Sequence, residues 1–203
     1  MSENSQPAGR EFDAGEQARA DIYRLLGALL AAPPDAAMIG LLRDLQPAAD
    51  TADTAMKAVW QGLRAAAANA DPDRLKDEYF KLFIGLGRGE LVPYASFYIH
   101  GLLMEKVLAS LREELAGLGI ERQADVAEPE DHAAAVCEIM GMIISEDGLH
   151  SKQSAFFEDY VAPWLGHFFA DLGEAEAADF YRAVAQLGQQ FLAVEQRYFS
   201  LPV

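Results

Sequence analysis

Apolar residues recur roughly every three to four positions along almost the whole chain, and this periodicity limits the fold more than any other feature. The alternation of apolar and polar residues that marks β-strands between turns is absent. The sequence therefore predicts an all-α fold. Because the chain has 203 residues, of which 51% are hydrophobic, it can bury its own core. We expect one helical domain of about eight to ten helices, or two helical halves packed together.

Proline and glycine residues mark where the predicted helices begin and end. The proline pair at residues 33–34 should stop the first helix. Asp71 and Pro72 are an N-cap and a first-turn proline for a later helix, and Gly119 is a candidate C-cap. Pro163 falls within a helical pattern and should kink it. The predicted helices cover approximately residues 12–31, 36–45, 72–83, 96–118, 131–145, 151–171 and 174–199, with one more that carries Met56, Val59, Trp60 and Leu63.

The sequence has no convincing internal repeat and one candidate boundary. Residues 1–11 are expected to form a disordered tail, followed by a helical domain over residues 12–199. The polar segment 119–130 is a candidate hinge between two helical halves. The N-terminal residues lack the pattern of a secretory signal, and no apolar run approaches the ~20 residues that cross a bilayer. With a single cysteine, Cys137, on an apolar helical face, these features favour the reducing cytoplasm.

The charge balance excludes one class of partner. The chain has 32 acidic and 16 basic residues and a formal net charge of -16. Such a surface repels the phosphates of nucleic acids, so nucleic-acid binding is not expected. Two interpretations of the acidic surface stay open. It keeps the protein soluble, or it attracts a partner segment that carries basic residues.

The four histidines lack the neighbours of a helical metal site. Carboxylate-bridged metal pairs in helical bundles use Glu-x-x-His, but the residues three positions before the histidines are Phe97, Pro129, Asp147 and Trp164. The His-Glu-x-x-His motif is also missing, and a single cysteine excludes a thiolate zinc cluster. We therefore predict no metal, no catalytic residues and no cofactor.

The glycine-rich segment at residues 85–89 invites comparison with a phosphate-binding loop. A P-loop ends in Gly-Lys-Ser/Thr and lies between a strand and a helix, and neither feature is present. The segment is therefore interpreted as a turn between two helices. A nucleotide-binding enzyme stays an alternative, although no motif in the sequence supports it.

The adjacent residues Asp131 and His132 allow two interpretations. The carboxylate could hold the imidazole and raise its pKa, although no Ser or Cys nucleophile is identifiable beside the pair. Alternatively, Asp131 caps the helix that follows while Glu130 complements its dipole. Because the segment at 93–96 also begins a helix, we expect it to lie near the start of the Asp131 helix and to form one side of a groove.

Aromatic residues cluster in the same region and separate into two groups. Leu82, Phe83 and Phe97 are expected in the core, where large apolar residues normally lie. Tyrosine combines an apolar ring with a hydroxyl group that requires a partner, which suits the wall of a peptide-binding groove. Tyr79 and Tyr94 are therefore the groove candidates.

Three motifs occur in order along the chain: E-Y-x-x-L-F-x-G from Glu78, P-Y-x-S-x-Y from Pro93 and E-P-x-D-H from Glu128. In this order and at these separations they resemble the TorD/DmsD family of cytoplasmic chaperones, which mature molybdenum-containing redox enzymes. A weaker match runs from Gln153 to Trp164, where Tyr160 stands in place of the family's usual histidine. The similarity covers most of the chain.

The resemblance implies a binding protein and not an enzyme. Family members are all-helical, bind the twin-arginine signal peptide of a molybdoenzyme precursor, and hold the precursor until its molybdenum cofactor is inserted. Such a ligand presents a basic segment followed by an apolar segment, which suits carboxylates beside an apolar groove. The protein would be a monomer or a homodimer. The candidate signal-peptide-binding residues are Tyr79, Leu82, Phe83, Pro93, Tyr94, Ser96, Glu128, Asp131 and His132.

Two questions stay open at this point. A NarJ-type chaperone would serve a cytoplasmic nitrate reductase subunit, although the P-Y-x-S and E-P-x-D-H motifs favour the TorD/DmsD type. The motifs also do not distinguish among clients, which include trimethylamine oxide reductases, dimethyl sulfoxide reductases and formate dehydrogenases.

Overall fold

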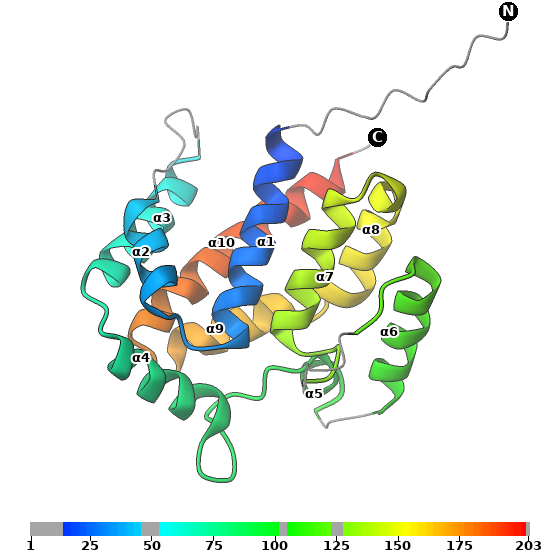
Figure 1. Ribbon diagram of the computed structural model, residues 1–203. Helices are drawn as coiled ribbons and strands as arrows, with labels where there is room; N and C mark the ends of the chain where they lie inside the picture. Colours follow the sequence, from blue (N-terminus) through cyan, green and yellow to red (C-terminus); the bar gives the residue numbers. More distant parts are fainter. Residues whose placement is uncertain (1–13, 46–52, 102–104, 123–127, 202–203) are drawn as a thin grey trace, which may run out of the picture.

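The computed structural model describes residues 14–45, 53–101, 105–122 and 128–201. Over these ranges the protein is all-α, with ten α-helices and no β-strand, as the periodicity predicts (Figure 1). The predicted tail at 1–11 and the middle of the predicted hinge at 119–130 lie outside the described residues. The helices are α1 (Ala14–Ala31), α2 (Ala36–Asp44), α3 (Thr54–Ala68), α4 (Pro72–Tyr79), α5 (Ala95–His100), α6 (Glu105–Leu118), α7 (Ala133–Ser145), α8 (Gln153–Phe156), α9 (Leu165–Glu174) and α10 (Phe180–Ser200).

The helix boundaries confirm several of the predicted caps and correct one long helix. α4 begins with Asp71 as its N-cap and Pro72 in its first turn, and it continues into a π-helical turn, η1 (Phe80–Ile84). The predicted helix over 96–118 is instead two helices, α5 and α6. α5 ends at Gly101, whose φ of +74° is a left-handed conformation that glycine adopts at little cost.

A second predicted helix, over 151–171, is divided rather than kinked. It consists of a 3-10 turn, η2 (Asp147–Lys152), then α8, then a π-helical turn, η3 (Phe157–Val161), and finally α9. Pro163 lies in the break before α9, because proline cannot donate the backbone hydrogen bond that a continuous helix requires. The next predicted helix, over 174–199, begins later than expected, at Phe180.

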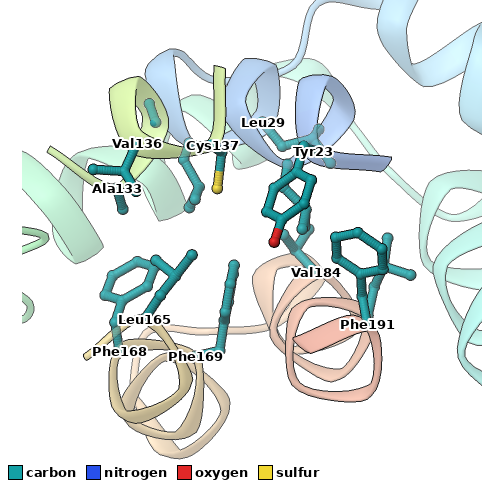
Figure 2. Close-up of a cluster of buried hydrophobic side chains, with 14 of the residues drawn as sticks. Tyr23, Leu29, Ala133, Val136, Cys137, Leu165, Phe168, Phe169, Val184 and Phe191 are labelled. Carbon is teal, nitrogen blue, oxygen red and sulfur yellow. The ribbon is translucent and has the colours of Figure 1, made fainter. Parts of the chain in front are cut away.

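The core lies between two layers of helices. Figure 2 shows side chains from α1 and α7 pointing toward side chains from α9 and α10. Burial of each large apolar side chain stabilises the fold by about 1.5–3 kcal/mol. The single cysteine is a core residue, as predicted, and burial raises the pKa of its thiol. The buried residues labelled in the figure are Tyr23, Leu29, Ala133, Val136, Cys137, Leu165, Phe168, Phe169, Val184 and Phe191.

Two glycines allow α1 and α7 to cross closely. A Cβ atom on Gly27 of α1 would lie 2.8 Å from Cγ of Glu138, and one on Gly141 of α7 would lie 3.1 Å from Cγ of Arg24. Because both side chains are missing, the two helices approach each other more closely than larger residues would permit. The first turn of α7, which directly follows the E-P-x-D-H motif, is thereby fixed against α1.

The start of α10 is capped from another part of the chain. Asp179, at the N-cap position, makes no side-chain capping hydrogen bond. The buried carboxylate of Glu78 in α4 instead accepts the backbone N–H groups of Asp179, Phe180 and Tyr181, at 2.8, 3.2 and 2.8 Å. Glu78, the first residue of the E-Y-x-x-L-F-x-G motif, therefore joins α4 to the entrance of α10.

Candidate functional site

The P-Y-x-S-x-Y and E-P-x-D-H motifs meet at a short antiparallel bridge. Tyr94 pairs with His132. The Ala95 N–H group donates to the Asp131 carbonyl oxygen at 2.9 Å, and the Ala133 N–H group donates to the Pro93 carbonyl oxygen at 2.8 Å. The predicted proximity of these two helix entrances is confirmed, and in Figure 1 α5 lies at the N-terminal end of α7.

Asp131 caps a helix, but it is not the helix that follows it. The side chain is buried, and its Oδ2 atom accepts the N–H group of Ser96 in the first turn of α5, at 3.2 Å. The N-cap of α7 is instead His132, whose Nδ1 atom accepts the N–H group of Ala134 at 3.1 Å. The prediction that Asp131 caps its own helix is therefore wrong. Asp131 therefore caps the N-terminus of α5, and His132 caps the N-terminus of α7.

The alternative interpretation, in which the neighbouring carboxylate raises the pKa of His132, is also wrong. Burial lowers the pKa of this imidazole below its ordinary value, and this outweighs the opposing influence of the Glu128 and Asp131 carboxylates. The hydrogen bond from Ala134 has the same consequence, because Nδ1 accepts it only while that atom carries no proton. The ring is therefore neutral, with its proton on Nε2.

Tyr94 connects the bridge to the surface. Its ring packs edge-to-face on the His132 ring, with the centroids 5.1 Å apart. Its hydroxyl group donates to the Glu128 carboxylate at 2.5 Å. Burial, followed by the hydrogen bond to Glu128, raises the pKa of the Tyr94 hydroxyl. The tyrosine therefore stays protonated and presents its half-buried ring to the neighbouring surface.

A hollow of about 610 Å³, here called the Tyr94 hollow, lies on that surface. Its wall is mainly apolar, and the Arg88 guanidinium lies 5.7 Å from the centroid of the Phe97 ring. Ile84 on its rim is 54% exposed. An exposed apolar hollow of this kind suits an apolar ligand segment. The lining residues are Phe83, Ile84, Gly87, Arg88, Gly89, Leu91, Val92, Pro93, Tyr94, Phe97 and Gly101.

The candidate residues fall into three groups around this hollow. Three of them line it: Phe83, Pro93 and Tyr94. Glu128 is exposed and holds the Tyr94 hydroxyl. The others are buried beneath the surface and support it: Tyr79, Leu82, Ser96, Asp131 and His132.

Two expectations about the aromatic residues need correction. Tyr79 is only 8% exposed, burial raises the pKa of its hydroxyl to about 12, and this hydroxyl donates to the carbonyl oxygen of Leu30 at 3.1 Å. Tyr79 is therefore a core residue and not part of a groove wall. Phe97, expected in the core, is half-buried and lines the hollow. Phe83 packs against the core, as expected, and also lines the hollow. Leu82 is fully buried, as predicted.

Sequence reasoning missed the contribution of the glycine-rich segment. Gly85 has a φ of +63°, and a Cβ atom there would lie 1.9 Å from the carbonyl oxygen of Arg88. The segment is thus a tight turn, as interpreted, but Gly87, Arg88 and Gly89 also line the hollow. The three glycines within five residues could have indicated an exposed turn whose backbone is open to a ligand.

Tyr160, where the family usually has histidine, contacts a neighbouring helix. Its hydroxyl group donates to the carbonyl oxygen of Ser110 in α6, at 3.2 Å. The Trp164 indole donates to the Tyr160 carbonyl oxygen at 2.7 Å, and Trp164 is fully buried. The weaker fourth motif thus joins η3 to α6 through Tyr160, and its buried Trp164 holds the segment just before α9 in place.

The described residues contain no group of three or more histidine, cysteine, aspartate or glutamate side chains arranged to hold a metal ion. None of the described helices is both long and apolar enough to cross a membrane.

Known proteins that resemble this chain define its class as a chaperone. The family model described as nitrate reductase delta subunit matches residues 49–170, more than half of the chain. Chaperone protein TorD of Aliivibrio fischeri is 27% identical over 212 aligned residues, which cover 94% of this chain and 98% of the relative. Chaperone protein TorD of Shewanella pealeana is 26% identical, with 87% of each chain covered.

A solved structure supports the fold. The crystal structure described as a putative redox enzyme maturation protein from Archaeoglobus fulgidus superposes with a TM-score of 0.59, covering 95% of this chain and 99% of that chain, at 20% identity. The chain belongs to the nitrate reductase delta subunit family of TorD/NarJ-type redox enzyme maturation chaperones. Its homologues are chaperones and not enzymes.

Proposed function

We propose that the protein binds the twin-arginine signal peptide of a molybdoenzyme precursor in the cytoplasm and holds the precursor while its molybdenum cofactor is inserted. The observation that carries this proposal is the Tyr94 hollow, an exposed apolar surface built by two of the family motifs. The Glu128 carboxylate stands at its edge, on a chain with a net charge of -16. A signal peptide has the complementary composition, since it joins a basic segment to an apolar one.

The apolar segment of the peptide would occupy the Tyr94 hollow. Phe83, Tyr94 and Phe97 offer aromatic faces there, and an apolar peptide gains affinity by covering them. Asp131 and His132 act as positioning residues in this proposal. They are buried and hold the entrances of α5 and α7 together, so that the Tyr94 ring and the Glu128 carboxylate face the ligand.

A second candidate function is a NarJ-type chaperone that serves a nitrate reductase subunit in the cytoplasm. The description of the matching family model, nitrate reductase delta subunit, favours this alternative. In that case the ligand would be a segment of the nitrate reductase subunit. The same hollow would bind its apolar residues.

Isothermal titration tests the proposal and separates the two candidates. Synthetic twin-arginine signal peptides of several molybdoenzymes would be titrated beside an N-terminal peptide of a nitrate reductase catalytic subunit. Saturable binding of at least one signal peptide supports the proposal. Binding of the nitrate reductase peptide alone favours the NarJ-type function, and binding of no peptide contradicts both.

Phe97 provides the site-specific variant. Phe97→Ala removes part of the hollow wall and should weaken signal-peptide binding by about ten-fold or more, the scale of an aromatic contact at the centre of an interface. Ile99→Ala is the matched control, because Ile99 lies on the same helix, is 37% exposed and is not among the lining residues. Equal effects of the two variants would place the binding site elsewhere.

A further inference from the structure

A second surface hollow, the α6–α7 groove, lies beside the first. Its volume is about 380 Å³, and its floor is formed by Leu115 and Ile120 at the end of α6 and by Ile139 and Met142 of α7. Met142 is 38% exposed. Glu128 lines this groove, while its hydrogen-bond partner Tyr94 lines the Tyr94 hollow. The two hollows therefore adjoin along the Tyr94–Glu128 hydrogen bond.

The carboxylates of the groove differ in whether a partner neutralises them. Glu130 is paired with Arg112 at 2.9 Å and lies 3.9 Å from Arg122. Glu128 accepts the hydroxyl group of Tyr94. Glu121 and Glu138 differ from both, because neither makes a hydrogen bond or ion pair with any residue in the described part of the chain, and of these two it is Glu138 that packs against α1. The groove thus contains a carboxylate without a cation.

Glu138 is an exposed residue, but part of its side chain is covered by α1. Its Cγ atom lies close to Gly27 of α1, at the crossing with α7, so the stem of the side chain is held against a packed surface. Partial burial there raises the pKa of the Glu138 carboxyl group. A cation that reached this position would remove the cost of partial desolvation and would gain a charge-assisted hydrogen bond.

We propose that the α6–α7 groove receives the basic segment of the signal peptide, with an arginine guanidinium on Glu138, while the apolar segment lies in the Tyr94 hollow. The proposal rests on the function proposed above and adds the direction in which the peptide lies. The apolar floor suits the methylene groups of arginine, and the carboxylate suits its planar guanidinium. A continuous peptide passes over the Tyr94–Glu128 hydrogen bond between the two hollows.

A thermodynamic cycle on Glu138 and the arginine pair tests this assignment. The wild type and Glu138→Gln would each be titrated with a synthetic twin-arginine signal peptide and with the same peptide carrying Gln-Gln in place of Arg-Arg. Glu138→Gln should weaken binding of the arginine peptide roughly three- to ten-fold and leave binding of the Gln-Gln peptide unchanged. Glu113→Gln is the matched control, because Glu113 is an exposed residue of α6 that does not line the groove.

The possible outcomes separate this inference from the proposed function. Peptide binding that is unaffected by Glu138→Gln, or equally weakened for both peptides, overturns the assignment of the groove while signal-peptide binding itself stands. The assignment is also overturned if Glu113→Gln weakens binding of the arginine peptide selectively, since the loss then reflects the overall charge of the protein and not a contact in the groove. Absence of binding by the wild type overturns both. Thermal unfolding provides the folding control, and Glu138→Gln should unfold at the same temperature as the wild type or higher, because it removes a charge without a partner.

Discussion

His132 accepts a backbone hydrogen bond through the ring atom that would carry its second proton. Because burial lowers its pKa in the folded protein, the unfolded chain binds that proton more readily. The contribution of His132 to stability is therefore fully present above its ordinary pKa of 6.5 and is lost as the pH falls below that value. We expect the free energy of unfolding to fall between pH 7.5 and pH 5.5, by at most about 1.4 kcal/mol per pH unit from this residue.

Two substitutions isolate the contribution of His132 from that of other groups. Asparagine is a good N-cap without a titrating ring, so His132→Asn should keep most of the stability at pH 7.5 and lose less of it at pH 5.5 than the wild type. His132→Ala leaves the Ala134 N–H group without its acceptor and should cost about 1–3 kcal/mol. Denaturant unfolding at both pH values measures these effects. Parallel pH dependences of the wild type and His132→Asn would contradict the argument.

Tyr23 carries a buried hydroxyl group that has no hydrogen-bond partner among the described residues. The nearby carboxylate of Glu195 accepts two hydrogen bonds from Arg19, at 2.6 and 2.8 Å, and burial together with this carboxylate raises the pKa of the Tyr23 hydroxyl. Tyr23→Phe removes the hydroxyl and keeps the ring in its core position. We expect it to raise the free energy of unfolding by about 1 kcal/mol, and the melting temperature by a few degrees. A lower melting temperature would mean that the hydroxyl is hydrogen-bonded in solution.

At the scale of single residues, the sequence predicts whether a side chain is buried better than it predicts which group the side chain bonds to. Cys137 and Leu82 could be assigned to the core from periodicity alone, and both are fully buried. The hydrogen bonds of Asp131 and His132 could not be predicted, since they depend on a bridge to a segment about thirty-five residues away. Tyr79 shows the same limit, because its partner is the carbonyl oxygen of Leu30 in another helix.

At the scale of helices, the entrance of α10 depends on one side chain from α4. Glu78→Ala leaves the N–H groups of Asp179, Phe180 and Tyr181 without their acceptor, and they are partly or fully buried. The loss should destabilise the protein by about 3 kcal/mol, because hydrogen bonds to a charged acceptor are among the stronger ones. Glu78→Gln keeps one acceptor oxygen and should cost less.

Thermal unfolding of the two Glu78 variants measures this difference. Asp77→Ala serves as the control. Asp77 is the neighbour of Glu78 on the same helix, and its carboxylate makes no hydrogen bond that joins α4 to α10. Unfolding temperatures that are equal for Glu78→Ala and the control would show that α10 begins without this cap.

Helices that a proline or an N-cap residue introduces could be located from the sequence, as α4 shows with Asp71 and Pro72. The break at Gly101 could not, because the apolar pattern continues through it and a left-handed glycine is recognisable there only once packing is known. At Pro163 the sequence indicates a kink, and the helix is divided there instead. The apolar periodicity therefore determines which segments are helical more reliably than how many helices they form.

At the scale of the whole molecule, the net charge of -16 should influence binding at long range. Affinity for a twin-arginine signal peptide should weaken as salt screens this attraction, by roughly three- to ten-fold between about 0.05 and about 0.5 M NaCl. The apolar contacts in the Tyr94 hollow should persist. Titration at both salt concentrations measures the effect, with the Gln-Gln peptide as a control of lower salt dependence. An affinity that does not change with salt would show that the net charge of the protein does not contribute to peptide binding.

The fold and the candidate site differ in how far the sequence could predict them. The all-α class follows from periodicity, because a helix must bury one face wherever it packs. The meeting of the 93–96 and 131–132 segments could be anticipated, since both stand at helix entrances. The wall of the Tyr94 hollow could not, because the exposure of Phe97 and of the 85–89 turn depends on how α5 is placed against its neighbours.

The close crossing of α1 and α7 at Gly27 and Gly141 contrasts with the lighter packing of α6. α7 packs closely against α1. α6 contributes two buried side chains, Leu111 and Leu115, to the described core, packs Val107 and Leu118 against it, and is also held by the hydrogen bond of Tyr160 to Ser110. If a client segment binds as proposed, we therefore expect it to displace α6 more readily than α7. The bound segment would keep one immobile wall while the other yields to its shape, so clients with different sequences could be held without refolding the chaperone.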